Sequence, residues 1–115
     1  MIINPNLGAP KFITKPSDTI AIQDQSARFE CTVDAFPKAK ISWFLNEKEL
    51  TLKDNVKFEI DAKTSASNLV IPKVLSTHLG KLKVKASNTV GEIEHMFELN
   101  VLGKYIFYLV DCVNY

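Results

Sequence analysis

Short runs of alternating apolar and polar residues, separated by turn-forming residues, make up most of the chain. Between Ala27 and Val33 the odd-numbered positions are apolar or cysteine, and the even-numbered positions are Arg, Glu and Thr. A period of two places one face of a strand in a core and the other in water. Comparable β-prone runs occur at Lys11–Lys15, Ile20–Ile22, Ile41–Leu45, Val56–Ile60, Leu69–Ile71, Lys81–Ala86 and Ile93–Val101. About eight short strands without helical periodicity predict an all-β fold of two packed antiparallel sheets.

Three turn or break signals refine this outline. Pro16 interrupts the first run, because proline cannot donate a hydrogen bond to a strand ladder. The segment Asn46–Lys48 is expected to turn the chain, and Asn88–Gly91 is expected to form a hairpin turn with Gly91 at positive φ.

Composition limits the class of protein. The chain has 115 residues, the size of one ordinary domain, and 46% of them are hydrophobic, enough for one core. A net charge of +1 favours neither nucleic acid nor an anionic membrane as partner, and no apolar run is long enough to span a bilayer. The first residues do not resemble a signal peptide, no Asn-x-Ser/Thr site occurs, and only two cysteines are present. These three features together predict that the protein resides in a reducing cytosol.

Several local motifs together resemble one family. They are Pro10-Lys11-Phe12, Phe29-Glu30-Cys31, Phe36-Pro37, Ile41-Ser42-Trp43, Leu69-Val70-Ile71, Ala86-Ser87-Asn88-Thr89-Val90-Gly91 and Leu99-Asn100-Val101. From Pro10 to about Leu102 the chain resembles an intermediate-set immunoglobulin domain, most like those of the intracellular muscle giants titin, twitchin and obscurin. The resemblance implies an immunoglobulin-like β-sandwich over residues 10–102, with an N-terminal extension at 1–9 and a hydrophobic C-terminal tail at 103–115.

The chain departs from the family's extracellular pattern at one stretch. Where that pattern has Asp-x-Gly-x-Tyr-x-Cys, this chain reads His78-Leu79-Gly80-Lys81-Leu82-Lys83-Val84. Leu82 replaces the corner tyrosine and Val84 replaces the second cysteine, so no inter-sheet disulfide is expected. Apolar packing then has to offset the roughly 2–4 kcal/mol that such a bond contributes. The residues expected to form this core signature are Cys31, Trp43, Leu69, Leu82 and Val84.

No arrangement of residues predicts catalysis. Cys31 has inward parity and is expected to be an inert buried thiol, while Cys112 lies in the tail with no histidine near it in the sequence. His78 and His95, the latter expected in an edge strand, lack companions at metal-ligand spacing. Phosphate-binding loops and hydrolase or metalloprotease motifs are also missing, so the chain is predicted to be no enzyme and to need no cofactor or metal.

A row of lysines is the most conspicuous surface feature. Lys81, Lys83 and Lys85, with Lys40 and Met96, form a candidate face for an acidic partner such as an actin or myosin surface. If the hairpin turns at Asn88–Gly91, however, Lys85 lies opposite Glu94 and Lys81 opposite Glu98. Such pairs are partly neutralised, which favours an ordinary solvated face over a basic stripe.

The tail contains an uncharged β-prone run at 105–110. Exposed runs of this kind tend to aggregate, so the tail is a candidate for self-association. An isoform-specific end without a role is the favoured alternative.

The function implied by the resemblance is structural. It is that of a force-bearing, protein-binding module of a cytoplasmic muscle protein in the sarcomere. Ile20–Ile22 is expected to pair with the segment Phe97–Val101, so that pulling on the two ends of the chain loads their hydrogen bonds together. Two alternatives are a regulatory domain next to a kinase, as in the twitchin-like giants, and a cell-surface adhesion domain.

Overall fold

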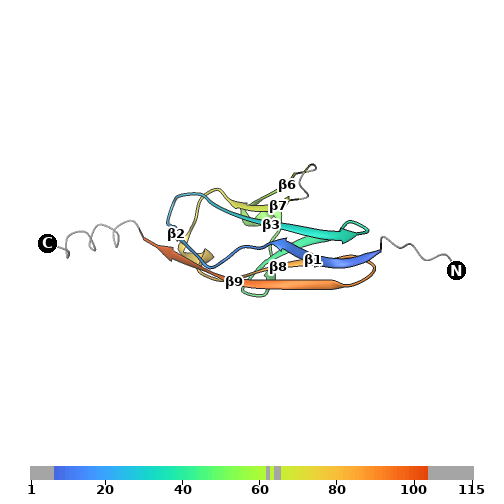
Figure 1. Cartoon of the computed structure of the whole chain (residues 1–115). Coiled ribbons are helices and arrows are strands. Elements are labelled where there is room, and N and C mark those ends of the chain that lie inside the picture. Colours follow the sequence, from blue (N-terminus) through green and yellow to red (C-terminus); the bar gives the residue numbers. More distant parts are fainter. Residues whose placement is uncertain (1–6, 62, 64–65, 104–115) are drawn as a thin grey trace.

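A computed structural model describes residues 7–61, 63 and 66–103, and strands make up most of them. The strands form two sheets that face each other (Figure 1). In order across the first sheet these are β1 (Gly8–Thr14), β3 (Ala27–Phe36), β7 (Ala66–Ile71) and β6 (Lys57–Asp61). Across the second they are β2 (Thr19–Ile22), β9 (Glu92–Leu102), β8 (Gly80–Ser87), β4 (Lys40–Leu45) and β5 (Lys48–Glu49). Two 3₁₀ turns, η1 (Leu52–Asp54) and η2 (Ser76–His78), complete the described elements.

The pairing is antiparallel everywhere except between β2 and β9. Those two strands, from opposite ends of the chain, run parallel, with Ile20 opposite Asn100 and Ile22 opposite Leu102. β1 and β2 belong to different sheets, and the break between them contains Pro16. The predicted two-sheet sandwich is confirmed, and no disulfide occurs among the residues described.

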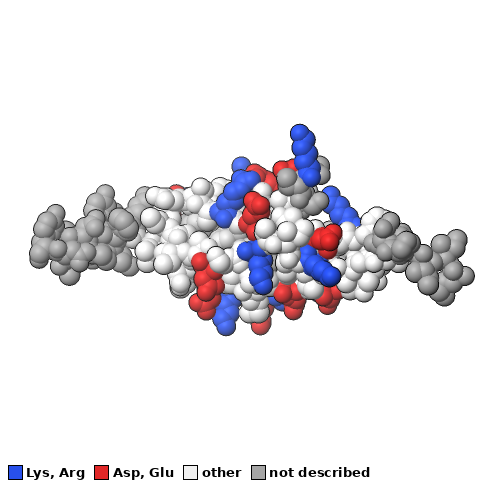
Figure 2. Space-filling model, viewed as in Figure 1, with Lys and Arg blue, Asp and Glu red and all other residues white. Residues whose placement is uncertain are grey.

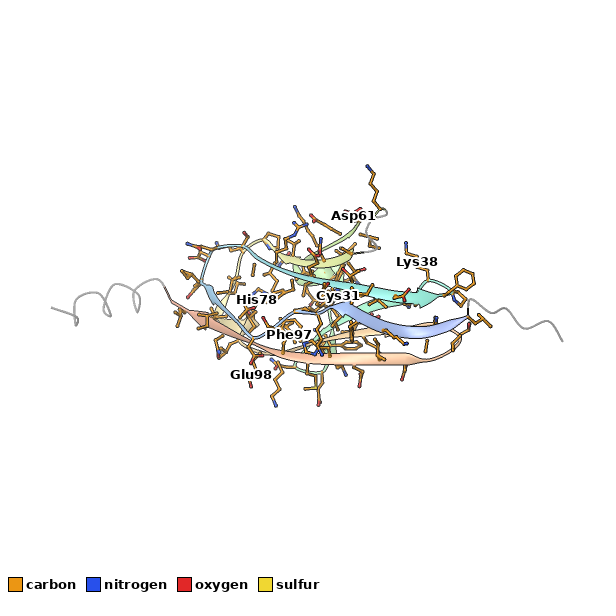
Figure 3. The ribbon with its side chains drawn as sticks, in the orientation of Figure 1. Cys31, Lys38, Asp61, His78, Phe97 and Glu98 are labelled. Atoms are coloured by element: carbon orange, nitrogen blue, oxygen red, sulfur yellow. The ribbon has the colours of Figure 1, made fainter. Side chains whose placement is uncertain are left out.

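The core lies between the sheets and is built from the alternating positions of both. Cys31, Leu69, Leu82 and Val84 are fully buried, and Trp43 is 2% exposed. Figure 3 shows Cys31 between the two sheets, and Glu98 on the side of β9 that faces away from the core. Burying each large side chain of this kind stabilises the fold by roughly 1.5–3 kcal/mol, so packing alone can offset an absent disulfide.

Two local expectations differ from the structure. Lys48 belongs to β5, because the hairpin between β4 and β5 needs only Asn46 and Glu47, both at positive φ. Gly91 does not have positive φ. Its lack of a side chain matters instead because a β-carbon there would lie 3.2 Å from the Ala9 Cβ.

Asn88 joins three segments at the end of the sandwich where β1 begins. Its side-chain amide nitrogen donates to the carbonyl oxygens of Gly8 and Pro37, each at 2.9 Å. Its Oδ1 accepts from the backbone N–H groups of Val90 at 2.9 Å and Gly91 at 3.1 Å. One side chain therefore satisfies backbone groups of the β1 start, the β3–β4 loop and the β8–β9 turn.

Candidate protein-binding surface and load-bearing strands

The outer face of β8 and β9 carries most of the predicted partner residues. Lys83 lies opposite Met96 in the ladder, and Met96 is 57% exposed. Two surface hollows adjoin the Met96 side chain. One, of about 300 Å³, is lined by Asn46, Glu47, Lys81, Lys83 and Met96. The other, of about 320 Å³, is lined by Asp18, Lys81, Met96, Phe97 and Glu98. We call this surface the Met96 face.

The register of the lysine row is as predicted, but its ion pairs are not. Lys81 lies opposite Glu98 and Lys85 opposite Glu94 in the ladder. The ion pairs run diagonally instead, from Lys83 to Glu94 and from Lys85 to Glu92, each at 3.2 Å. Lys83 also lies 4.7 Å from the centre of the Phe44 ring, a favourable cation–π position.

Lysine side chains reach past the residue directly across the ladder, so a diagonal carboxylate competes with the one opposite. Lys81 and Lys85 were each predicted to be partly neutralised by a glutamate across the ladder, and for Lys81 this prediction is wrong. Within the described part of the chain Lys81 makes no ion pair, and it shares both hollows with Met96.

Lys40 does not belong to the Met96 face. It lies opposite Ser87 at the far end of β4 and lines a different groove, between β4 and β6. Figure 2 shows side chains of both signs interspersed over the middle of the face in view, without a large area of one sign. A partner that binds the Met96 face would meet one lysine and one thioether, since the other cations are already paired.

Side chains from β9 and from the β1–β2 connection reinforce the parallel β2–β9 pair. The Glu98 N–H donates to Asp18 Oδ1 at 2.8 Å, and His95 Nε2 lies 2.6 Å from the Pro16 carbonyl oxygen. The Gln23 N–H donates to the Leu102 carbonyl oxygen at 2.8 Å, which extends the pairing beyond β2. The expectation that His95 lies in an edge strand is wrong, because β9 has β8 on one side and β2 on the other.

Sequence reasoning did not find Asp18, Asn46 or Asn88 as contact residues. Asp18 directly precedes a strand, and Asn46 and Asn88 stand in turns. These are positions where a short polar side chain commonly bonds to a backbone group. The residue type and position were visible in the sequence, whereas the partner groups, far away along the chain, were not.

Two titratable side chains in the described interior, Cys31 and His78, have shifted pKa values. Burial raises the pKa of the Cys31 thiol to about 11, and the charge of Glu30 adds to this effect, so the nucleophilic thiolate is scarce near neutral pH. Among the described residues no three His, Cys, Asp or Glu side chains gather as metal ligands would. The described residues also contain no helix long and apolar enough to cross a membrane.

The side chain of His78 caps the N-terminus of the 3₁₀ turn η2, which precedes β8. Its Nδ1 accepts a hydrogen bond from the Leu75 N–H at 2.8 Å, and the residue is buried. Burial lowers the pKa of His78, because the charged imidazolium loses hydration there. Protonation would also put an N–H on Nδ1, where it would face the Leu75 N–H. The folded domain therefore holds His78 in its neutral form.

We expect this histidine to make stability depend on pH. The unfolded chain binds the proton near pH 6.5, while the folded chain resists it, so the contribution is complete above that pH and is lost as the pH falls. Urea unfolding at a series of pH values should show a steeper loss below pH 6.5 for the natural chain than for His78→Asn, which keeps an acceptor but does not titrate. Equal slopes for the two proteins would contradict the assignment.

The fold and its surfaces define a β-sandwich module whose special features are a parallel terminal strand pair and a mixed-charge outer face. The family model of the immunoglobulin I-set domain matches residues 10–101, so the chain belongs to the immunoglobulin I-set family. The predicted family is confirmed.

Relatives include muscle proteins and one lectin. The chain is 27% identical over 99 residues to the muscle M-line assembly protein unc-89 of Caenorhabditis elegans, covering 86% of this chain and 1% of that protein. It is 29% identical over 94 residues to smooth-muscle myosin light chain kinase of Gallus gallus, covering 82% of this chain and 5% of the kinase. It is 32% identical over 101 residues to sialic acid-binding Ig-like lectin 10 of Mus musculus, covering 88% of this chain and 14% of the lectin. The chain thus corresponds to a small part of each of these three relatives.

Solved titin structures share the fold. An I-band fragment of titin matches with a TM-score of 0.78 and 25% identity, over 84% of this chain and 34% of the fragment. The titin domains z1z2 in complex with telethonin match with a TM-score of 0.79 and 24% identity, over 85% of this chain and 50% of that chain.

Proposed function

We propose that this chain is a force-bearing and protein-binding module of a muscle or cytoskeletal protein in the cytoplasm. The observation that carries the proposal is the parallel pairing of β2 with β9. β1 begins at one end of the sandwich and β9 ends at the other (Figure 1). The muscle proteins among the relatives, and the titin domains among the similar structures, support the same assignment.

The direction of the strands explains the mechanical role. Parallel strands drawn from opposite ends of the chain slide past each other when those ends are pulled apart. All the hydrogen bonds between them are then loaded together and do not open one after another. The Asp18 and His95 contacts attach the β1–β2 connection to β9 as well, so the load reaches β9 over the whole stretch Pro16–Ile22.

Proline in place of Asn100 tests this load path. The Glu98 N–H points toward the β2 side, at Asp18, and backbone N–H groups alternate along a strand, so the Asn100 N–H points to β2 as well. Proline removes that donor. We expect Asn100→Pro to lower the unfolding force in single-molecule pulling well below that of Asn100→Ala, which keeps the N–H.

Circular dichroism first establishes that both variants are folded. If folded Asn100→Pro unfolded at the same force as Asn100→Ala, the β2–β9 pair would not be the clamp. The proposed function would then lose its principal support.

A regulatory domain beside a kinase is the second candidate, because a myosin light chain kinase is among the relatives. The two candidates differ in what adjoins the domain. A catalytic domain encoded next to it would favour the regulatory role, and further immunoglobulin-like domains on both sides would favour the load-bearing one.

A further inference from the structure

An apolar groove runs along the side of the sandwich where the two sheets end at β4 and β6. Its volume is about 230 Å³. Its apolar walls are the side chains of Ile41 and Trp43 from β4 and of Phe58 and Ile60 from β6. Ser67 of β7, the ladder partner of Ile60, also lines it.

The groove is open because β6 has no strand beyond it and little facing it. Phe58 and Ile60 lie opposite Leu69 and Ser67 in the ladder, so they have the inward parity of the core. They are nevertheless 38% and 68% exposed. β6 is the last strand of its sheet, and β5 pairs only with Phe44 and Leu45 of β4. An unpaired strand edge thus borders an apolar groove, which is the arrangement that accepts an added strand.

Some polar groups around the groove have no partner among the described residues. Within the described residues neither Lys38 nor Lys40, both exposed groove residues, makes an ion pair, and Figure 3 shows Lys38 pointing away from the sandwich. The nearby carboxylate of Glu59 is already bound to Arg28 at 2.6 Å. Asn68, another residue that lines the groove, is only 7% exposed, and its Oδ1 is buried without a hydrogen-bond partner in the described part of the chain. The groove therefore combines two lysines that form no ion pair with one buried amide oxygen that accepts no hydrogen bond.

We propose that this groove binds an extended segment of a partner protein as an additional strand along β6. An apolar side chain of that segment lies between Ile60 and Ile41, and an acidic residue pairs with Lys38 or Lys40. The lysines of the Met96 face, by contrast, are mostly paired within the chain, so the groove is the better site for an acidic partner. This inference rests on the protein-binding half of the proposed function and does not depend on the load path.

A designed peptide and the full chain test the proposal. The probe is a short blocked peptide in which valine and threonine alternate between two terminal aspartates. A second peptide with terminal lysines is its control. Trp43 is the only tryptophan of the chain and lines the groove, so its fluorescence reports occupancy directly. Hydrogen exchange of the β6 amides reports whether a strand has been added.

Ile60→Lys is the decisive variant, and Ile13→Lys is its matched control, because Ile13 is 65% exposed on the opposite edge strand, β1. We expect saturable binding of the acidic peptide with protection of β6. Affinity should fall about tenfold or more for Ile60→Lys, as for a central anchor residue. It should be unchanged for Ile13→Lys and for Lys81→Glu on the Met96 face. Ile60→Thr serves the same purpose if Ile60→Lys does not fold.

Several results would overturn the proposal. These are no fluorescence change at millimolar peptide, equal affinity for the lysine-ended peptide, or unchanged affinity in folded Ile60→Lys or Ile60→Thr. A chain that dimerises without peptide and becomes monomeric as Ile60→Lys would show that a second copy occupies the groove. Failure here leaves the pulling experiment on Asn100→Pro unaffected, because that variant alters β9 and not β6.

Discussion

Replacing Gly80 with alanine is expected to lower the free energy of unfolding by about 3 kcal/mol or more, a large part of the total for a domain of this size. Gly80 has a φ of +148°, a conformation that residues with a β-carbon rarely adopt. A β-carbon there would also lie 2.7 Å from Asn46 Cγ. Asn46 cannot simply move aside, because its Oδ1 accepts from the Lys81 N–H at 3.0 Å and its Nδ2 donates to the Leu79 carbonyl oxygen at 3.4 Å.

Chemical denaturation of four variants, Gly80→Ala, Gly8→Ala, Asn46→Gly and the double variant Asn46→Gly/Gly80→Ala, separates these causes. Gly8→Ala is the matched control and should be nearly neutral, since nothing lies within 4 Å of a β-carbon at Gly8. In an Asn46→Gly background the collision is gone and only the backbone strain remains, so Gly80→Ala should cost less there than in the natural chain. A Gly80→Ala protein as stable as Gly8→Ala would show that the described geometry of this turn is wrong.

Replacing Phe97 with alanine is expected to lower the free energy of unfolding by about 3–5 kcal/mol. The Phe97 ring lies 5.3 Å from the Phe29 ring of the other sheet. It also meets Trp43 edge-on at 6.4 Å and stacks on His95 at 5.9 Å. The substitution thus removes three aromatic contacts at once and leaves a cavity between the sheets.

The neighbouring residue provides the control for Phe97. Met96→Ala changes the next position of β9, but that side chain is exposed, so its effect should stay within about 0.5 kcal/mol. Urea unfolding followed by circular dichroism measures both. A loss for Phe97→Ala no larger than that for Met96→Ala would contradict the assignment of Phe97 to the core.

The strands of this fold could be predicted because the sequence records which face of each strand is buried. Phe29, Cys31 and Val84 alternate with charged or polar neighbours, and the structure buries all three. β6 shows the limit of the same reasoning. Its alternation is equally regular, yet Phe58 and Ile60 are exposed, because parity gives the direction of a side chain and not what faces it.

The contacts of the candidate surfaces depend on pairings between segments far apart in the sequence. Register across the β8–β9 hairpin followed from its turn and was predicted correctly. The diagonal ion pairs depend on side-chain conformation, which the register leaves open. The separation of Lys40 from Lys83 depends on the pairing of β4 with β8, in which Lys40 lies opposite Ser87 and Lys83 opposite Phe44. The groove depends on where two different sheets end. None of these follows from alternation within one strand.

Cys31 is the one cysteine among the described residues, and its thiol is protonated near neutral pH and fully buried. Opening and closing of residues 7–103 therefore requires no sulfur chemistry, neither an oxidant to remake a bond nor a reductant to break one. The contacts that hold the two sheets together in this part of the chain are noncovalent, chiefly those of the apolar core. The stability of this part of the chain is therefore expected to be the same in reducing and in oxidising surroundings.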